Sequence, residues 1–291
     1  MRFVASRIAF HQDFFGRQRA TSEILNRCLP TYFGHRYDSH PTGENHCLVK
    51  NVKDGPDDVS RGFTYCPHLY LYRADCGDYL NPGFLRQIDC ETVRIIFEVG
   101  CSDGTDTLRL AAAFPAEVHA FECNPHALVE ARRRCAGANA VRLVEKAAWD
   151  ADCTIPFFPV TAAVEKETGK VIKNPGASSC FEARPDYLSQ YFQTEVMVEA
   201  TRLDTYCTRR GITSIDLLCM DVQGAELRVL KGLGTLLERV RYIITEIEVK
   251  PLYYGQALYP EVHGYLKASG FRQAAEVYRD QWFSDYLYIN E

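Results

Sequence analysis

The sequence predicts an α/β protein with a Rossmann-like fold: a seven-stranded, mostly parallel sheet with helices on both faces, preceded by an N-terminal accessory region. Two observations predict this fold. From residue 94 onward, short apolar runs rich in β-branched residues alternate with helical stretches, which is typical of a parallel sheet. The last two apolar segments, 271–277 and 286–289, alternate in polarity and predict a closing antiparallel pair.

The first ninety residues are the least regular part of the chain. A helix is expected over 11–28, and the stretch 38–61, with its Pro and Gly residues, is typical of a loop. We therefore divide the chain into an accessory or substrate-recognition region, 1–90, and a main domain, 91–291. The alternative of a zinc site stays open here, but the spacing of its candidate ligands matches no standard pattern, so no metal is expected. These candidates are His46, Cys47, Cys66, His68 and Cys76.

The run 95–99 predicts the first buried strand, and it leads through a glycine turn into a helix over 105–114. Such a turn is where α/β proteins hold ligands. Positions 100, 102 and 105 are Gly, Ser and Thr, so the turn is not the G-x-G-x-x-G of dinucleotide sites. Acids crowd it, and they would repel a pyrophosphate while tolerating a sulfonium and an amino group. The turn therefore favours S-adenosylmethionine, with contacts from Glu98, Gly100, Cys101, Ser102, Asp103, Gly104 and Thr105. The alternative is an ordinary tight turn with helix-capping acids.

The next two strands are expected over 118–121 and 141–144, with a helix over 125–135 between them. Glu122 ends the second strand about twenty residues after the glycine turn, which places a carboxylate within reach of two ribose hydroxyls. Cys123 follows it. After the third strand, Lys146 and Ala147 would let an adenine ring lie against the backbone. Ordinary packing at the end of a strand explains these two residues equally well.

Residues 151–204 interrupt the alternation of strands and helices. The stretches 154–160 and 195–201 are expected to be extended, with a polar turn over 165–175 between them. An insertion on the ligand side of a sheet is a natural lid or substrate loop. Ser178 and Ser179 in it could bond the methionine carboxylate or a substrate hydroxyl, or could equally cap a short helix.

The segment 215–226 contains the fourth strand, which Asp221 ends, and an amphipathic helix is expected over 225–239. The fifth strand, 242–247, carries Glu246, and a further helix is expected over 259–269. Asp221 and Glu246 are therefore the candidate catalytic acids, and Asp221 has a rival role as a partner of the cofactor amino group. Glu226 is a further candidate, although it could simply favour the N-terminus of its helix.

Composition limits the function classes. The net charge is −5 and no basic patch stands out, which argues against a nucleic-acid partner. No apolar stretch is long enough for a membrane span, and the chain start lacks a signal-peptide core. The twelve cysteines form no C-x-x-C pair, so we expect a reduced, cytoplasmic protein. The oligomeric state is not predicted.

Five segments together resemble the FkbM family of S-adenosylmethionine-dependent methyltransferases. They are Phe97-Glu-Val-Gly-Cys-Ser-Asp-Gly104, Phe121-Glu-Cys-Asn-Pro125, Thr201-Arg-Leu-Asp204, Ile215-Asp-Leu-Leu-Cys-Met-Asp-Val-Gln-Gly-Ala-Glu226 and Ile243-Ile-Thr-Glu246. The resemblance spans roughly residues 92–290. The family's usual Asp-Val-Glu-Gly-x-Glu has Gln223 in place of Glu here, and Glu98 stands where an aspartate is usual. The resemblance implies a class I methyltransferase fold and O-methylation of a sugar, glycan or natural-product hydroxyl.

Methyl transfer from a sulfonium is an in-line displacement that depends on positioning and on a group that accepts the hydroxyl proton. Two other classes stay open. A nicotinamide-dependent oxidoreductase would use the same sheet, and a non-catalytic binding module would keep the fold. Such a module is expected to have lost the acids at the strand ends, but Glu98, Glu122 and Asp221 are present.

Overall fold

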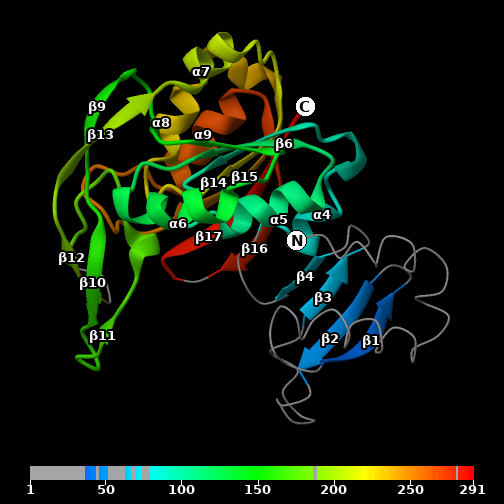
Figure 1. Cartoon of the computed structure of the whole chain (residues 1–291), viewed down its shortest axis with the longest axis horizontal. Helices are drawn as coiled ribbons and strands as arrows, with labels where there is room; N and C mark the ends of the chain where they lie inside the picture. The colour runs from blue at the N-terminus through cyan, green and yellow to red at the C-terminus, as the bar shows by residue number, and fades with distance from the viewer. Residues whose placement is uncertain are drawn as a thin grey trace.

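The computed structural model describes residues 37–43, 46–51, 63–66, 70–73, 79–185, 189–279 and 281–291. The helix expected over 11–28 lies outside the described residues, as do His68 and Cys76 of the zinc alternative. The division of the chain at residue 90 stays a prediction. Before that point, four strands form an antiparallel sheet in chain order (Figure 1): β1 (Tyr37–Gly43), β2 (His46–Asn51), β3 (Phe63–Cys66) and β4 (Tyr70–Arg73). The loop expected over 38–61 is therefore wrong for its first part, because 38–43 and 46–51 pair with each other as strands.

A seven-stranded sheet forms the centre of the main domain, in the order β16-β17-β15-β14-β5-β6-β7. The strands β7, β6, β5, β14 and β15 are parallel, and β17 runs antiparallel between β15 and β16. This arrangement confirms the predicted fold class. The strands are β5 (Ile95–Val99), β6 (Glu117–Phe121), β7 (Val141–Val144), β14 (Ile215–Met220), β15 (Val240–Glu248), β16 (Phe271–Arg279) and β17 (Phe283–Asn290).

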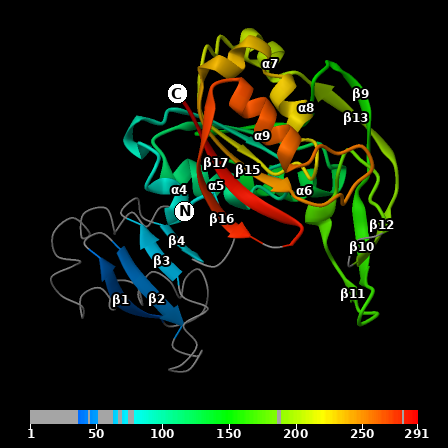
Figure 2. The ribbon, with the colours of Figure 1, turned by 180° about the vertical axis from the view of Figure 1, so that it is seen from behind.

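Helices cover both faces of this sheet (Figures 1 and 2). One face packs through a core that includes Phe84 of α4 and Leu110 of α5, and the other through a core that includes Tyr206 of α7, Val229 of α8 and Val262 of α9. Among the described residues, none of the helices has the length and apolar character needed to cross a membrane. The helices are α4 (Pro82–Leu85), α5 (Thr105–Ala113), α6 (Pro125–Cys135), α7 (Leu203–Arg210), α8 (Glu226–Lys231) and α9 (Tyr259–Ala268).

The register of the central strands brings their carboxyl ends to one level. Val99 of β5 pairs with Met220 of β14 on one side and with Phe121 of β6 on the other. The next residue of each chain segment is therefore at the same edge of the sheet. Because β14 and β6 lie on opposite sides of β5, this edge is also where the strand order reverses, which is where open α/β sheets bind ligands.

The insertion builds two small sheets beside this edge (Figure 1). In one, β13 pairs with β8 and β9; in the other, β10 pairs with β11 and β12. The polar turn expected over 165–175 is wrong in extent, because β10 continues to Glu165 and β11 pairs back onto it. The strands are β8 (Ala147–Ala148), β9 (Cys153–Phe157), β10 (Val160–Glu165), β11 (Val171–Ile172), β12 (Ser189–Gln193) and β13 (Val196–Thr201).

The single helix expected over 225–239 is also wrong. The chain forms α8, leaves the helix at Gly232 and continues as a 3₁₀ helix, η5 (Gly234–Arg239). Gly232 packs so closely on another segment that a Cβ there would lie 2.1 Å from the carbonyl oxygen of Trp149. Its own carbonyl accepts the Asp204 amide at 3.1 Å. These tertiary contacts, which hydrophobic spacing does not reveal, end the helix.

Candidate functional site

A pocket opens at the carboxyl edge of the sheet, where β5, β6 and β14 end. Its volume is about 650 Å³, including the space at its mouth. The central strands contribute one wall and the insertion contributes the other. The lining residues are Val99, Gly100, Ser102, Phe121, Glu122, Cys123, Asn124, Ala127, Lys146, Ala147, Ala148, Phe157, Pro175, Gly176, Ser178, Cys180, Asp221, Val222 and Ala225.

The glycine turn holds β5 against both neighbouring strands. The amides of Gly100 and Cys101 donate to the carbonyl of Phe121, each at 3.0 Å. Gly100 has a φ of +86°, and a Cβ there would lie 1.9 Å from the carbonyl oxygen of Asp221. Only glycine fits this position, because any side chain would collide with backbone in a conformation that L residues avoid. The turn therefore brings Asp221 next to the first loop of the pocket.

Glu122 is the structural centre of that loop. Its carboxylate accepts three backbone N–H bonds, from Ser102 at 2.7 Å, Cys123 at 2.8 Å and Asn124 at 2.6 Å. Burial raises the pKa of Glu122, and the three bonds act against that rise. A carboxylate offers about four acceptor positions, so one is left for a ligand at the pocket wall. The acid thus shapes the loop as well as facing the pocket.

Six of the predicted cofactor contacts do not line the pocket. Glu98 lies below it, buried, and accepts the Thr107 hydroxyl at 2.5 Å. Burial raises its pKa well above the ordinary value. The other five are Cys101, Asp103, Gly104, Thr105 and Ser179. Of the predicted set, Gly100, Ser102, Glu122, Cys123, Lys146, Ala147 and Asp221 do line it.

Local packing explains these exceptions. Asp103 accepts the Thr105 amide at 3.0 Å and pairs with Arg134 of α6 at 3.1 Å. The Thr105 hydroxyl also accepts a bond from Arg134, so Asp103 and Thr105 connect the start of α5 to α6. Gly104, with a φ of +78°, packs on α6, where a Cβ would lie 2.9 Å from the sulfur of Cys135. These residues hold the turn against α6.

The insertion contributes Ser178, one of the two candidate serines, and two residues that the sequence did not indicate, Phe157 and Cys180. Ser178, rather than Ser179, lies at the pocket; it accepts the Val160 amide at 2.9 Å and the Asn124 side-chain amide at 3.3 Å. Ser179 instead donates to the carbonyl of Gln223 at 2.7 Å. Phe157 and Cys180 also reach the pocket. No spacing in the chain predicts these contacts, because the insertion folds back over the sheet only in three dimensions.

Asp221 and Glu246 meet through a third side chain. Gln223 donates to Asp221 Oδ1 at 2.6 Å and to Glu246 Oε1 at 2.9 Å. Burial raises the pKa of Asp221, and the bond from Gln223 lowers it. Burial, and then the charge of Asp221, raises the pKa of Glu246 well above its ordinary value. Such a pair binds a proton more readily at one acid than at the other.

Glu226 is buried and is directed into the turn before its helix, where its Oε1 accepts the Gly224 amide at 3.2 Å. Burial raises its pKa to about 8. The bond from Gly224 gives Glu226 a structural role in the turn before its helix.

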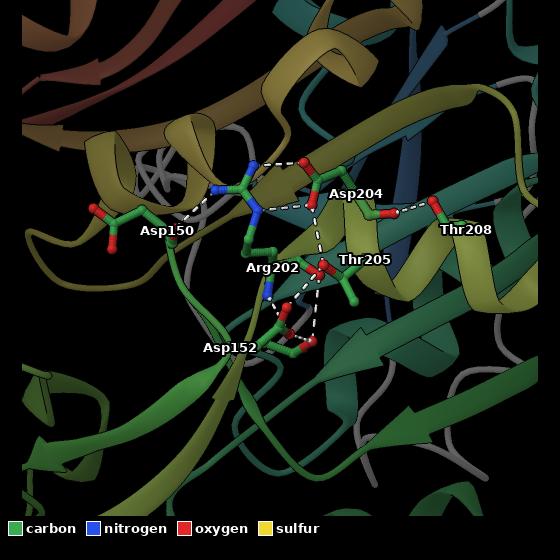
Figure 3. A network of polar contacts seen from close by, with 7 residues as sticks. Asp150, Asp152, Arg202, Asp204, Thr205 and Thr208 are labelled. Atoms are coloured by element: carbon green, nitrogen blue, oxygen red, sulfur yellow. Dashed lines mark hydrogen bonds and ion pairs between the residues drawn. The ribbon is translucent and has the colours of Figure 1, made fainter.

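No residue of the Thr201–Asp204 segment lines the pocket, and the segment instead bonds to the residues that follow β8. Figure 3 shows the network around Arg202. Arg202 donates to both oxygens of Asp204, at 2.9 and 2.5 Å, and to the carbonyl of Asp150 at 2.8 Å. Asp152 accepts the Thr201 hydroxyl at 2.7 Å. This network ties β13 and α7 to the turn that follows β8, and β8 is part of the pocket wall.

Comparison with known proteins shows the family of the chain. The sequence profile of the Methyltransferase FkbM domain matches residues 98–273, more than half of the chain. The chain belongs to the FkbM methyltransferase family. The resemblance predicted from the motifs is therefore confirmed, and so is S-adenosylmethionine, the cofactor predicted from the glycine turn.

Within known proteins, the 2-O-methyltransferase NoeI of Sinorhizobium fredii (strain NBRC 101917 / NGR234) is 35% identical over 170 residues. The match covers 56% of this chain and 66% of NoeI. Among solved structures, a fibrillarin pre-rRNA processing protein of Methanococcus jannaschii has a TM-score of 0.46 at 13% identity, over 88% of this chain and 98% of that one. Fibrillarin of Aeropyrum pernix, in complex with S-adenosyl-L-methionine, has a TM-score of 0.45 at 10% identity, over 87% and 97%.

Within the ranges that the structure describes, no group of three or more His, Cys, Asp or Glu side chains is arranged to hold a metal ion.

Proposed function

We propose that this FkbM family member is an O-methyltransferase that methylates a hydroxyl of a sugar, glycan or other natural product. One observation carries the proposal: Asp221 lines the same pocket as the glycine turn and Glu122. A proton acceptor and a nucleoside site within one pocket are what transfer of a methyl group to an alcohol requires. The name of NoeI, which describes a transfer to oxygen, supports the same class of reaction.

The residues of the pocket fit S-adenosylmethionine. Because Gly100 has no side chain, the turn can lie close to Asp221. The remaining acceptor position of the Glu122 carboxylate suits a ribose hydroxyl. Lys146 and Ala147 would border the base. The cofactor supplies a methyl group on a positively charged sulfur, for which a wall with the Asp221 carboxylate is favourable. We propose these residues, with Ser102 and Cys123, as its contacts.

We also propose that the protein is cytoplasmic and that its acceptor is not a nucleic acid. The net charge of −5 supports the proposal on the acceptor, because a nucleic-acid groove needs a basic surface. Residues 1–90 are proposed to assist acceptor recognition.

The test is an assay of the whole chain with S-adenosylmethionine carrying a labelled methyl group and a panel of mono- and oligosaccharides and hydroxylated natural products. Mass spectrometry should find product that carries the label on oxygen. Binding of S-adenosylhomocysteine without transfer to any panel member would support a non-catalytic module. Binding of a nicotinamide cofactor in its place would support the oxidoreductase alternative.

Asp221→Asn is the matched variant for this assay. Because the amide keeps the shape but cannot accept the hydroxyl proton, we expect methyl transfer to fall by about 10²–10⁴-fold. S-adenosylhomocysteine should still bind, as measured by calorimetry. A variant that binds and still transfers at the wild-type rate would exclude Asp221 as the proton acceptor.

A further inference from the structure

Gln223 has an unusual backbone for its residue type. It follows β14 and Asp221 and has a φ of +51°, in the left-handed region that favours glycine. Within the described residues, the other non-glycine residue in this region is Ser102, in the glycine turn of the same pocket. Strained backbone of this kind persists where surrounding contacts hold it, and it is often found at functional sites. The contacts that hold Gln223 in this conformation therefore indicate its functional role.

The side-chain amide of Gln223 has a defined orientation. Its Nε2 lies 2.6 Å from Asp221 Oδ1 and 2.9 Å from Glu246 Oε1, so both of its N–H groups have a carboxylate acceptor. Its Oε1 lies 2.8 Å from the hydroxyl of Tyr253, which can donate to it. The opposite orientation would place the amide oxygen against two carboxylates, so the partners determine this one.

Both ends of Gln223 are anchored to the wall of the pocket. Tyr253 is 1% exposed, and its hydroxyl also lies 3.0 Å from the carbonyl of Ala177. Ser179, also 1% exposed, donates to the main-chain carbonyl of Gln223 at 2.7 Å. Ala177 and Ser179 alternate with Gly176, Ser178 and Cys180, which line the pocket. The amide thus joins two strand ends to the segment that closes the pocket.

We propose that Gln223 is a positioning residue for methyl transfer: its amide holds Asp221 and Glu246 in one hydrogen-bonded unit and keeps Asp221 ionised at the pocket wall. This inference rests on the proposed function. In the step that it serves, the acceptor hydroxyl gives its proton to Asp221 while its oxygen forms the bond to the methyl carbon. The carbon–sulfur bond breaks and its electron pair stays on sulfur, which becomes neutral.

The charges around Asp221 explain why such a donor is needed. The titratable groups that influence the pKa of Asp221 and of Glu246, or that lie near them, are acids or neutral phenols. They are Asp106 on α5, Glu122 after β6, Glu226 on α8, Glu246 and Glu248 on β15, Asp285 on β17, and Tyr79 and Tyr253. Any of these acids that is ionised favours a proton on Asp221, and so does burial. The amide of Gln223 opposes both effects, because a hydrogen bond donated to a carboxylate favours its ionised form.

Three variants separate this role from simple packing. Gln223→Met keeps the length of the side chain but removes both N–H donors. Gln223→Glu removes the same donors and adds a negative charge. Tyr253→Phe keeps Gln223 and removes the hydroxyl that orients it. The matched control is Gln273→Met, because Gln273 on β16 also accepts a tyrosine hydroxyl, that of Tyr259 at 2.8 Å, but contacts neither carboxylate of the pair.

The measurement is a carbon-13 NMR titration of protein labelled at the aspartate carboxyl carbons, with Asp221→Asn to assign the signal. We expect the apparent pKa of Asp221 to rise by about one unit or more in Gln223→Met, further in Gln223→Glu, and less in Tyr253→Phe. Gln273→Met should leave it unchanged. An unchanged titration in Tyr253→Phe and in a Gln223 variant that still binds S-adenosylhomocysteine would overturn the inference.

Methyl transfer gives the second readout. With an acceptor from the panel, the rise of the rate with pH should shift to higher pH in Gln223→Met by the same amount as the titration. If the titration shifts but the enzyme methylates no acceptor, the hydrogen-bonded unit of Gln223, Asp221 and Glu246 is supported and the proposed function is overturned. Active Gln223→Met with an unshifted pH profile would overturn the inference and leave the proposed function standing.

Discussion

At the scale of single residues, the site depends on side chains that serve the loop and the ligand together. Glu122 is the clearest example, because a carboxylate expected only to face ribose also satisfies three backbone amides. Buried donors that lose their acceptor cost free energy, so such residues affect folding and binding at once.

Glu122→Ala should therefore weaken the binding of S-adenosylhomocysteine and also lower stability. It leaves the amides of Ser102, Cys123 and Asn124 without their acceptor, at a cost of about 1–3 kcal/mol for the first unsatisfied group. Calorimetric titration and thermal unfolding of the same preparation measure the two effects. Weaker binding with an unchanged melting temperature would mean that the carboxylate contacts the ligand alone.

At the scale of elements, the course of the chain after β14 shows how tertiary contacts override a local pattern. The stretch 225–239 has the amphipathic spacing of one helix, yet it breaks at Gly232 against the carbonyl of Trp149. The break lets the Asp204 amide reach the Gly232 carbonyl and so joins α7 to α8.

Gly232→Ala should destabilise the protein by about 1–3 kcal/mol, because the new methyl group would overlap Trp149 backbone that α8 cannot move away from cheaply. Gly264→Ala is the matched control. Gly264 lies within α9, where a Cβ would meet nothing within 4 Å, so alanine should stabilise that helix by about 0.5–1 kcal/mol. Chemical denaturation of both variants measures the difference, and equal effects would contradict the role given to Gly232.

At the scale of the whole molecule, the carboxyl edge of the sheet gathers acids that are buried together. Burial raises the pKa of Glu226 to about 8, and it raises those of Glu98, Glu246 and Glu248 well above their ordinary values. Between the ordinary carboxyl pKa and these raised values, the folded chain keeps protons that the unfolded chain loses. Stability must then fall as the pH rises through this range.

We expect the melting temperature to be higher near pH 5 than near pH 8. For one such group the loss approaches about 1.4 kcal/mol per pH unit. Glu226→Gln should make the dependence less steep, since the amide carries no charge at either pH. Glu130→Gln is the control, because arginine side chains lower the pKa of exposed Glu130 to about 2, below the range of the experiment. Melting curves from pH 5 to 8 would contradict the explanation if Glu226→Gln kept the wild-type slope.

The central strands, the glycine turn and the acids at the strand ends were predictable from the sequence, whereas β1, β2 and β11 were not. Ile95–Val99, Gly100 and Asp221 were all predictable, because side-chain periodicity and turn chemistry depend on neighbours along the chain. The motifs around them also sufficed for the family, and with it the cofactor.

Which of these side chains face the pocket depends on tertiary contacts instead. Glu98 bonds to Thr107, Ser178 lines the pocket while Ser179 does not, and Gln223 joins two acids that lie 25 residues apart in the sequence. These outcomes depend on the register between strands and on how the insertion folds back over them. Such contacts join residues far apart in the chain, so no local pattern contains them.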